Sequence, residues 1–234
     1  MNYVVIPPEH HCLPIKGNKD VFPVNRIFCV GLNYKAHAIE MGMEPGNEAP
    51  FFFMKPATAI VTSEDGIMSI SYPPMTENFH HEVELVVAIG PGGKNISVNE
   101  ALDHIYGYAI GLDMTRRDLQ LKASSRGEPW EYGKSFFQSA PIGPISTVAD
   151  AGHPKDASIT LHVNDQVRQS SNINDMIRGP AELISHLSSY ETLLAGDLIM
   201  TGTPEGVSAV TAGDILKASI AGLGDITVSI SKES

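Results

Sequence analysis

The stretch Phe79-His80-His81-Glu82-Val83-Glu84-Leu85-Val86-Val87-Ala88-Ile89-Gly90 joins two glutamates to an apolar, β-branched run. With the two-residue period of a β-strand, Glu82 and Glu84 share one face, whereas Val83 and Leu85 point to the other. Two carboxylates roughly 7 Å apart repel each other, and in a β-rich core they also lose hydration unless a cation or proton compensates them. A divalent ion would do so, but a solvated edge strand with both glutamates outside explains the spacing equally well.

A second stretch, Tyr106-Gly107-Tyr108-Ala109-Ile110-Gly111-Leu112-Asp113, carries small residues on the strand face that ends at Asp113. Small side chains on one face indicate that another backbone or a ligand lies against the strand. Asp113 is therefore a candidate third metal ligand, although it would serve equally as a cap for the turn before Thr115. Three carboxylates form an all-oxygen set, which favours Mg²⁺ or Mn²⁺.

Composition excludes several classes of function. The 16 basic and 27 acidic residues give a formal net charge of -11, which opposes binding to a nucleic-acid backbone. Cys12 and Cys29 lack a Cys-x-x-Cys spacing, and His80 and His81 point to opposite faces of a strand, so no zinc site is indicated and His81 is expected to pack or hydrogen-bond. No apolar run approaches the ~20 residues of a membrane helix, and the first residues lack a signal-peptide pattern. We expect a cytoplasmic protein that binds neither nucleic acid nor membrane.

The pattern along the chain predicts a β-rich protein. Its 234 residues suit one catalytic domain at 21–234, preceded by an N-terminal arm or first strand at 1–20. Apolar runs bounded by turn residues predict strands at 26–31, 51–54, 83–89, 105–112, 158–163, 196–201, 214–220 and 225–230. Helices are predicted at 35–41, 97–104 and 174–188. Two similar Gly-Asp corners, at 195–199 and 212–216, each lead into a strand. Helices are too few for a doubly wound sheet, so the expected class is mixed, β-rich α+β.

Candidate acid–base groups lie outside these strands. His37 and Glu40 are three residues apart on the predicted helix, a spacing that lets a carboxylate orient an imidazole for water activation. An exposed helix pair accounts for the same spacing. Lys55 and Lys134 each follow or open an apolar strand, so each ammonium either turns inward to an anionic substrate or extends along the surface into solvent.

Two loops after the carboxylates offer further donors. Arg117 and Gln120 are expected in the loop beyond Asp113, where a solvated turn is the alternative. The segment Met200-Thr201-Gly202-Thr203-Pro204-Glu205-Gly206 has the glycines and hydroxyls of a backbone nest for a ligand carboxylate, or of a tight connection. Residues 90–94 lack the Walker spacing and no Gly-x-Gly-x-x-Gly opens a helix, which argues against nucleotide-binding folds.

Taken together, the chain resembles the fumarylacetoacetate hydrolase family from about Arg26 to its C-terminus. The matching motifs occur in the family's order: Val30-Gly31-Leu32-Asn33-Tyr34, Phe53-Met54-Lys55-Pro56, His80-His81-Glu82-Val83-Glu84-Leu85, Gly111-Leu112-Asp113-Met114-Thr115, Arg117-Asp118-Leu119-Gln120, Gly133-Lys134-Ser135-Phe136, Asn164-Asp165 and Thr201-Gly202-Thr203-Pro204-Glu205-Gly206-Val207. The resemblance implies a β-sandwich roll like the C-terminal domain of that family, with few short helices, usually forming a homodimer. Residues 111–120 and 126–130 look most like fumarylpyruvate hydrolases, many of which have Arg in place of Leu32.

The same resemblance implies roles for individual residues. Metal ligands fall on Glu82, Glu84 and Asp113, catalytic groups on His37, Glu40 and Lys134, and substrate contacts on Lys55, Arg117, Gln120 and Thr203. The expected activity is Mg²⁺- or Mn²⁺-dependent hydrolysis of a C–C bond in a 2,4-dioxo acid, fumarylpyruvate or another acylpyruvate, to pyruvate and a second acid during aromatic-compound catabolism. The alternatives are an oxaloacetate decarboxylase or a 2-hydroxyhepta-2,4-diene-1,7-dioate isomerase/decarboxylase on the same scaffold, and a non-catalytic protein that binds an organic acid.

Overall fold

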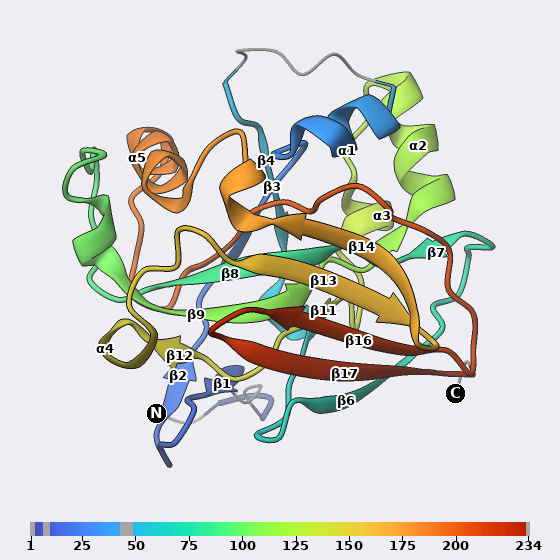
Figure 1. Cartoon of the computed structure of the whole chain (residues 1–234), viewed down its shortest axis with the longest axis horizontal. Coiled ribbons are helices and arrows are strands. Elements are labelled where there is room, and N and C mark those ends of the chain that lie inside the picture. Colours follow the sequence, from blue (N-terminus) through green and yellow to red (C-terminus); the bar gives the residue numbers. More distant parts are fainter. Residues whose placement is uncertain (1–2, 7–9, 43–48, 233–234) are drawn as a thin grey trace.

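Two β-sheets form most of the computed structural model, which describes residues 3–6, 10–42 and 49–232. The mixed six-stranded sheet has the spatial order β12 (Ser146–Thr147), β9 (Ile105–Leu112), β8 (Val83–Ile89), β15 (Leu198–Met200), β3 (Ile27–Val30) and β4 (Phe52–Lys55). The five-stranded sheet, nearest the viewer in Figure 1, has the order β14 (Gln166–Asn172), β13 (Ser158–Val163), β16 (Ile215–Ile220), β17 (Gly224–Ser231) and β6 (Ile67–Ser71). The predicted strand-rich pattern is confirmed.

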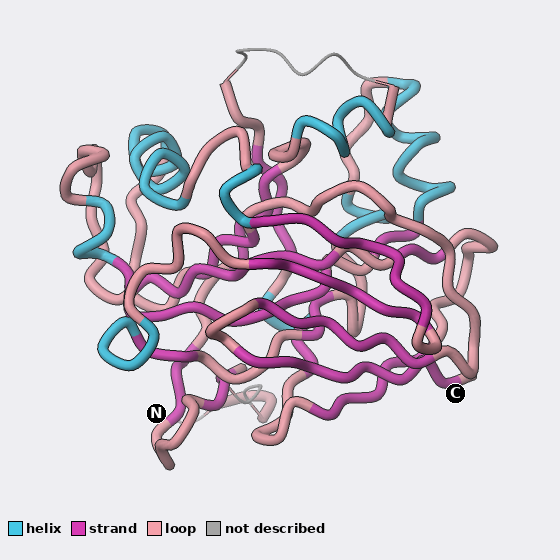
Figure 2. Tube along the Cα trace, in the orientation of Figure 1, coloured by secondary structure: helices cyan, strands magenta, loops and turns pink. Residues whose placement is uncertain are grey.

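Smaller elements surround these sheets. Three two-stranded pairs join β1 (Cys12–Pro14) to β2 (Val21–Pro23), β7 (Phe79–His80) to β10 (Thr115–Arg116), and β5 (Ile60–Val61) to β11 (Ala140–Pro141). The helices are short: α1 (Lys35–Glu40), α2 (Arg117–Arg126), α3 (Glu131–Lys134), α4 (Val148–Ala151) and α5 (Pro180–Tyr190). Figure 2 shows α1, α2 and α5 along one side of the sheets. No helix among the described residues is long and apolar enough to cross a membrane.

Strand β8 lies between two apolar clusters. Val83 and Leu85 pack between the two large sheets, whereas Val86 and Ala88 pack on the opposite face, over β1 and β2. This alternation places Glu84 on the face of Val86 and Ala88, as predicted from the two-residue period. Because both faces are covered, the strand is fully buried, and each large apolar side chain contributes about 1.5–3 kcal/mol through burial.

Two helix predictions were wrong in their extent. Segment 97–104 forms only the 3₁₀ turn η2 (Ala101–His104), although Ser97 Oγ donates to Glu100 Oε2 at 2.6 Å as the capping pattern suggested. Eight residues supply too few helical hydrogen bonds to offset the cost of nucleation. Segment 174–188 divides into the 3₁₀ turn η3 (Ile173–Asp175) and α5, because Pro180 disfavours helical geometry in the residue before it and begins the helix at its first position.

The two Gly-Asp corners behave alike, as predicted. Gly196 and Gly213 adopt φ values of +92° and +103°, and strands β15 and β16 begin two residues later. At Gly196 a Cβ would lie 2.6 Å from the carbonyl oxygen of Pro23, so this corner requires glycine for space as well as for its backbone angle.

Candidate active site

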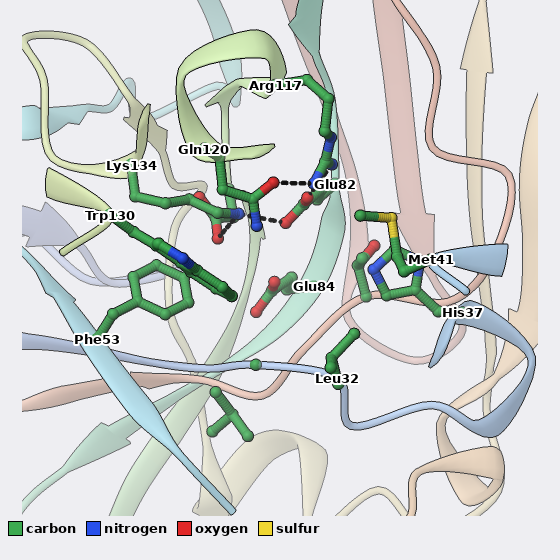
Figure 3. A pocket seen from close by; sticks show the side chains of 14 residues that line it. Leu32, His37, Met41, Phe53, Glu82, Glu84, Arg117, Gln120, Trp130 and Lys134 are labelled. Atoms are coloured by element: carbon green, nitrogen blue, oxygen red, sulfur yellow. Dashed lines mark hydrogen bonds and ion pairs between the residues drawn. The ribbon is translucent and has the colours of Figure 1, made fainter. Parts of the chain in front are cut away.

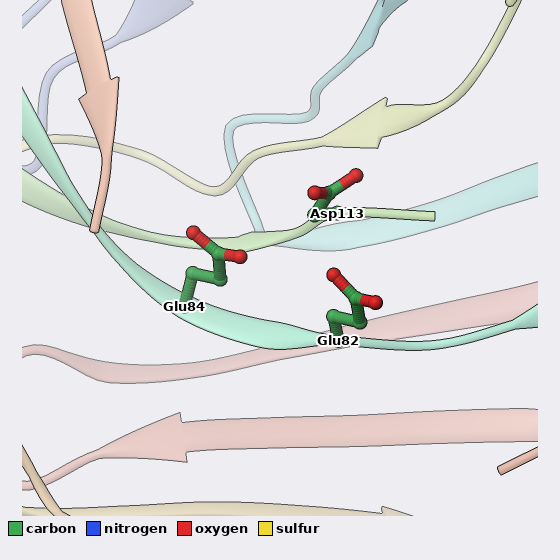
Figure 4. Close-up of side chains that lie close together, drawn as sticks. All are labelled: Glu82, Glu84 and Asp113. Atoms are coloured by element: carbon green, nitrogen blue, oxygen red, sulfur yellow. The ribbon is translucent and has the colours of Figure 1, made fainter. Parts of the chain in front are cut away.

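Three buried carboxylates converge at the ends of two paired strands. Glu84 on β8 lies opposite Gly111 on β9, and beyond this pair the backbone N–H of Asp113 donates to the carbonyl of Glu82 at 2.8 Å. This register brings one oxygen from each of Glu82, Glu84 and Asp113 within 4.8 Å of one another. Figure 4 shows the three side chains close together. All three residues are at most 4 % exposed, so the alternative of a solvated edge strand is excluded.

The small residues before Asp113 are needed for protein packing. A Cβ on Gly107 would lie 2.4 Å from the carbonyl oxygen of Ser146, and one on Gly111 would lie 2.7 Å from Cγ2 of Val86. Another backbone does approach this strand face, as predicted. The close neighbours are β12 and β8 of the protein itself rather than a ligand.

Lys134 lies among the carboxylates. Its Nζ donates to Glu82 Oε2, Asp113 Oδ2 and Thr115 Oγ1, each at 2.7 Å, which uses all three of its protons. The sequence predicted that Lys134 follows or opens an apolar strand. In the structure its side chain instead comes from the end of helix α3. Within this one-turn helix, Gly133 packs directly on the backbone of Gln120 in α2, which places Lys134 next to α2.

Two further cations complete the cluster. Lys55, at the end of β4, lies 2.8 Å from Asp113 Oδ1 and donates to the carbonyl of Met114 at 3.1 Å. Arg117 pairs with Glu82 and donates to Gln120 Oε1 at 2.7 Å. Arg117 and Gln120 were expected in a loop, but both lie in helix α2 and are at most 6 % exposed. The solvated-turn alternative is therefore wrong as well.

The three cations are not shared evenly among the three carboxylates. Three carboxylates face three cations, yet no lysine or arginine in the described part of the chain forms an ion pair with Glu84. Burial, followed by repulsion from Asp113 and Glu82, raises the pKa of Glu84 well above its usual value. Burial also acts to raise the pKa of Glu82, but Lys134 and Arg117 outweigh it and the net shift is downward. Glu84 is thus the carboxylate whose negative charge no neighbouring cation compensates.

The cluster suits a hard divalent ion on its own geometry. The donors are all carboxylate oxygens, the class that Mg²⁺ and Mn²⁺ prefer. Asp113 Oδ1 forms an ion pair with Lys55 but accepts no hydrogen bond, and Glu84 lacks a cationic partner, so both retain coordination capacity. Glu82, Glu84 and Asp113 would hold the ion.

The predicted histidine–glutamate pair is formed, with the imidazole of His37 buried and Glu40 exposed. On α1, His37 Nδ1 lies 3.0 Å from Glu40 Oε2, and His37 is only 5 % exposed. The other oxygen of Glu40 accepts the backbone N–H of Gly206 at 3.0 Å. Since Nδ1 faces a fixed carboxylate, Nε2 is left as the basic nitrogen of the ring.

The loop at 200–206 binds protein carboxylates rather than a ligand's. Gly202 donates its N–H to Glu84 Oε2 at 2.7 Å, so the predicted nest is occupied by the chain's own side chain. Thr203 Oγ1 donates to the carbonyl of Val83 at 2.8 Å and accepts from Gln169 at 2.8 Å. Gln169 also contacts His81 Nδ1 at 3.0 Å, which confirms that His81 serves hydrogen bonding.

Comparison with known proteins matches residues 26–231 to the family model described as fumarylacetoacetate (FAA) hydrolase C-terminal. The chain belongs to this family. It is 44 % identical to a fumarylpyruvate hydrolase of Ralstonia sp over 183 residues, covering 78 % of this chain and 93 % of that protein. It is 40 % identical to a mitochondrial oxaloacetate tautomerase of Oryza sativa subsp. japonica over 207 residues, covering 88 % and 91 %.

Among solved structures, the fumarylpyruvate hydrolase from Pseudomonas aeruginosa in complex with Mn²⁺ and pyruvate matches with a TM-score of 0.97 and 48 % identity, over 99 % of this chain and 100 % of that chain. The strand-rich fumarylacetoacetate hydrolase fold is therefore established for this chain, and its buried Glu82, Glu84 and Asp113 form a cluster that could hold a metal ion.

In this family member, the carboxylates open into a narrow cleft. Its lining includes eight of the ten site residues that the sequence singled out, namely His37, Glu82, Glu84, Asp113, Arg117, Gln120, Lys134 and Thr203. Glu40 does not line the cleft but contacts His37, which does. Lys55 lies beneath Asp113 and does not line the cleft. Figure 3 shows Glu84 between His37 and Met41 on one side and Phe53 and Trp130 on the other.

Five lining residues received no role from the sequence, namely Val30, Gly31, Met41, Phe53 and Trp130. They carry no acid–base chemistry, and only the fold places them on the cleft. All but Met41 lie in segments that carry the family resemblance, and Trp130 is also the single tryptophan of the chain, so these were the available signals.

Proposed function

We propose that the protein is a Mg²⁺- or Mn²⁺-dependent hydrolase that cleaves an acylpyruvate to pyruvate and a second carboxylic acid. The observation that carries this proposal is the match along nearly the whole chain to a fumarylpyruvate hydrolase crystallised with Mn²⁺ and pyruvate. A bound ion would supply Lewis-acid polarisation of the 2-oxo acid end of the substrate.

The charge of the cluster supports an anionic substrate. Glu82, Glu84 and Asp113 are offset by Lys55, Arg117 and Lys134, so the six side chains sum to zero. A divalent ion raises this local sum to about +2, and in a buried site such a charge attracts a carboxylate strongly. The local excess explains how a chain with a net charge of -11 binds an anion.

His37 is suited to act as the general base. Oriented by Glu40, its free nitrogen takes a proton from water, and the water oxygen forms a bond to C4 of the substrate. The C3–C4 bond then breaks, its electron pair stays on C3, and C3 receives a proton. The products are pyruvate and the acid derived from the acyl group.

Gln120 is the better placed donor for the charge that develops on the C4 oxygen. Its Oε1 accepts from Arg117 at 2.7 Å, which fixes the amide and leaves the NH₂ group for the cleft. Lys134 already spends its three protons on Glu82, Asp113 and Thr115. We assign Lys134 to holding the carboxylates and Gln120 to the oxyanion, where one donor contributes about 10²–10³-fold to kcat.

A second candidate activity is oxaloacetate tautomerisation or decarboxylation, since relatives named for these reactions are 40 % and 38 % identical to this chain. These reactions need enolate stabilisation but no hydrolytic water. The His37–Glu40 pair therefore favours hydrolysis.

The test is turnover of acylpyruvates with Mg²⁺, followed by loss of the enol absorbance and by enzymatic detection of pyruvate. His37→Ala should reduce hydrolysis about 10²–10⁴-fold, as expected for loss of a general base. Full turnover by this variant would refute the hydrolytic role. Faster consumption of oxaloacetate than of any acylpyruvate would favour the second candidate.

We keep three further proposals: a homodimer, a cytoplasmic location and a role in aromatic-compound breakdown. Light scattering after size-exclusion chromatography tests the first, fractionation of the source cells the second, and growth of a deletion strain on aromatic carbon sources the third.

A further inference from the structure

A second cavity adjoins the catalytic cleft. It has a volume of about 420 Å³ and shares Leu32, Phe53 and Trp130 as walls with the cleft, so the two pockets are adjacent. The remaining residues of its lining are Phe51, Phe52, Ser124, Pro129 and Glu131. We call this space the aromatic annex. Since it lies beyond the carboxylates, a substrate held at Glu82, Glu84 and Asp113 through its 2-oxo acid end has room there for its acyl tail.

The walls of the aromatic annex are apolar rings fixed against one another. Trp130 packs edge-on to Phe51 with ring centres 5.3 Å apart, and tilted to Phe53 at 5.7 Å. Phe51 in turn lies directly on Gly31, where an added Cβ would be 1.9 Å from the ring. Rings held in this way form a preorganised apolar surface for a ligand.

Leu32 is presented to this space by a constrained turn. Its φ of +55° lies in the left-handed region that a branched side chain disfavours. Asn33 holds the turn, because its side chain donates to the carbonyls of Arg178 at 2.9 Å and Thr201 at 2.8 Å. A disfavoured backbone angle that persists at a site points to a function for the side chain it positions.

The combined space has no cation to spare for a second carboxylate. Among the described residues lining the cleft and the aromatic annex, the only lysine and arginine are Lys134 and Arg117, and both are paired with Glu82. The one ionisable residue lining the aromatic annex is Glu131, which repels anions. Residues 41–50 contain neither lysine nor arginine.

We infer that the aromatic annex is the acyl-tail subsite and that it selects acylpyruvates whose acyl group ends in an uncharged alkyl or aryl group over those that end in a carboxylate. This inference rests on the proposed function for the placement of the 2-oxo acid end. Burying an apolar tail against Leu32, Phe51 and Trp130 gains roughly fourfold in affinity per methylene, whereas a terminal carboxylate loses hydration without gaining a partner.

The test is a pair of ligands of the same shape. With Mg²⁺ present, 7-methyl-2-oxooctanoate ends in an isopropyl group and 2-oxoheptanedioate in a carboxylate; neither has a 4-oxo group, so neither can be cleaved. Fluorescence of Trp130, the only tryptophan, reports binding without catalysis. We expect the isopropyl ligand to bind at least tenfold more tightly. Equal affinity, tighter binding of the dicarboxylate or no binding of either would overturn the inference.

Two variants that add the same charge at different positions test whether the selectivity arises in the aromatic annex. Leu32→Arg adds a cation to the subsite and should lower the isopropyl-to-carboxylate affinity ratio at least tenfold. Leu194→Arg adds the same charge at an exposed position beside Gly92, beyond the far end of β8, and should leave the ratio unchanged. An unchanged ratio in Leu32→Arg would also overturn the inference. Failure of the proposed function would instead appear as absence of cleavage of 7-methyl-2,4-dioxooctanoate and 2,4-dioxoheptanedioate, whatever the binding ratio.

Discussion

Gly202 donates its backbone N–H to Glu84 Oε2 at 2.7 Å, and this is the only hydrogen bond recorded for that carboxylate among the described residues. A neutral amide dipole offsets a buried charge less well than a lysine or arginine does. Glu84 therefore differs from Glu82, which has two cationic partners, although the two glutamates are separated by a single residue.

This difference predicts opposite effects of two similar substitutions on the metal-free protein. Glu84→Gln keeps an acceptor for Gly202 and removes an uncompensated charge, so in chelator at pH 8 it should raise the free energy of unfolding by about 1–3 kcal/mol. Glu82→Gln leaves Lys134 and Arg117 short of a partner and should lower it by about 3–5 kcal/mol. Urea unfolding measures both.

The stability gain expected for Glu84→Gln also depends on pH. The pKa of Glu84 is raised in the folded protein, so the folded state binds more protons above pH 4.5 and loses stability as pH rises. The gain in Glu84→Gln should therefore vanish near pH 4.5. Destabilisation of both variants at pH 8 would contradict the assignment of charges.

Removal of the metal should abolish turnover while the fold persists, because Glu82 and Asp113 keep their lysine and arginine partners without it and Glu84 keeps its hydrogen bond from Gly202. EDTA treatment followed by Mn²⁺ should restore activity, and Mn²⁺ at about 100 times its Kd should add about 2.7 kcal/mol to stability. In Glu84→Gln the same Mn²⁺ concentration should produce a much smaller shift. Calorimetry with chelated and reloaded protein measures the stability gain from Mn²⁺ in the wild type and in Glu84→Gln. Unfolding upon chelation would contradict the prediction.

Glu40→Gln should weaken the orientation of His37. The two oxygens of Glu40 face His37 Nδ1 and the Gly206 N–H, whereas the introduced amide has one acceptor oxygen and cannot serve both groups. We expect kcat to fall about 10–100-fold with little change in KM. A change confined to KM would indicate substrate binding instead.

His81 should make the fold sensitive to acid. Burial lowers the pKa of His81 to about 4, although its bond to Gln169 opposes the shift. The unfolded chain thus binds more protons between pH 6.5 and 4, and stability falls as pH falls through that range by up to about 3 kcal/mol. His81→Asn removes this dependence, so the stability difference between wild type and variant in chelator should shrink from pH 7 to pH 4. A constant difference would show that His81 is not buried in its neutral form.

The sequence predicted local geometry correctly where the geometry depends only on the repeat of a strand or a helix. The alternation along β8 placed Glu84 on the correct face, and the helical spacing of His37 and Glu40 formed the expected contact. Both depend only on residues near in sequence.

The errors arose where long-range contacts decide the structure. Helix α2 has the sequence RDLQLKASSR and lacks an apolar stripe, because Arg117 and Gln120 are buried by pairing with each other and with Glu82 instead of by apolar packing. Gly127, at φ +64°, ends the helix and was the available stop signal. The contact of Phe53 with Trp130 spans 77 positions and leaves no local pattern.

The loop from Gly202 to Gly206 binds two different parts of the site through its main chain. Gly202 holds Glu84 of the carboxylate triad, and Gly206 holds Glu40, which orients His37. These five residues thus act as a spacer that sets how far the ring of His37, the proposed base, lies from the carboxylate triad. Gly202 and Gly206 both have positive φ values and no room for a Cβ, so the spacer also depends on its two glycines. A single insertion or deletion would misalign the two halves of the site, so activity should be sensitive to the length of this loop.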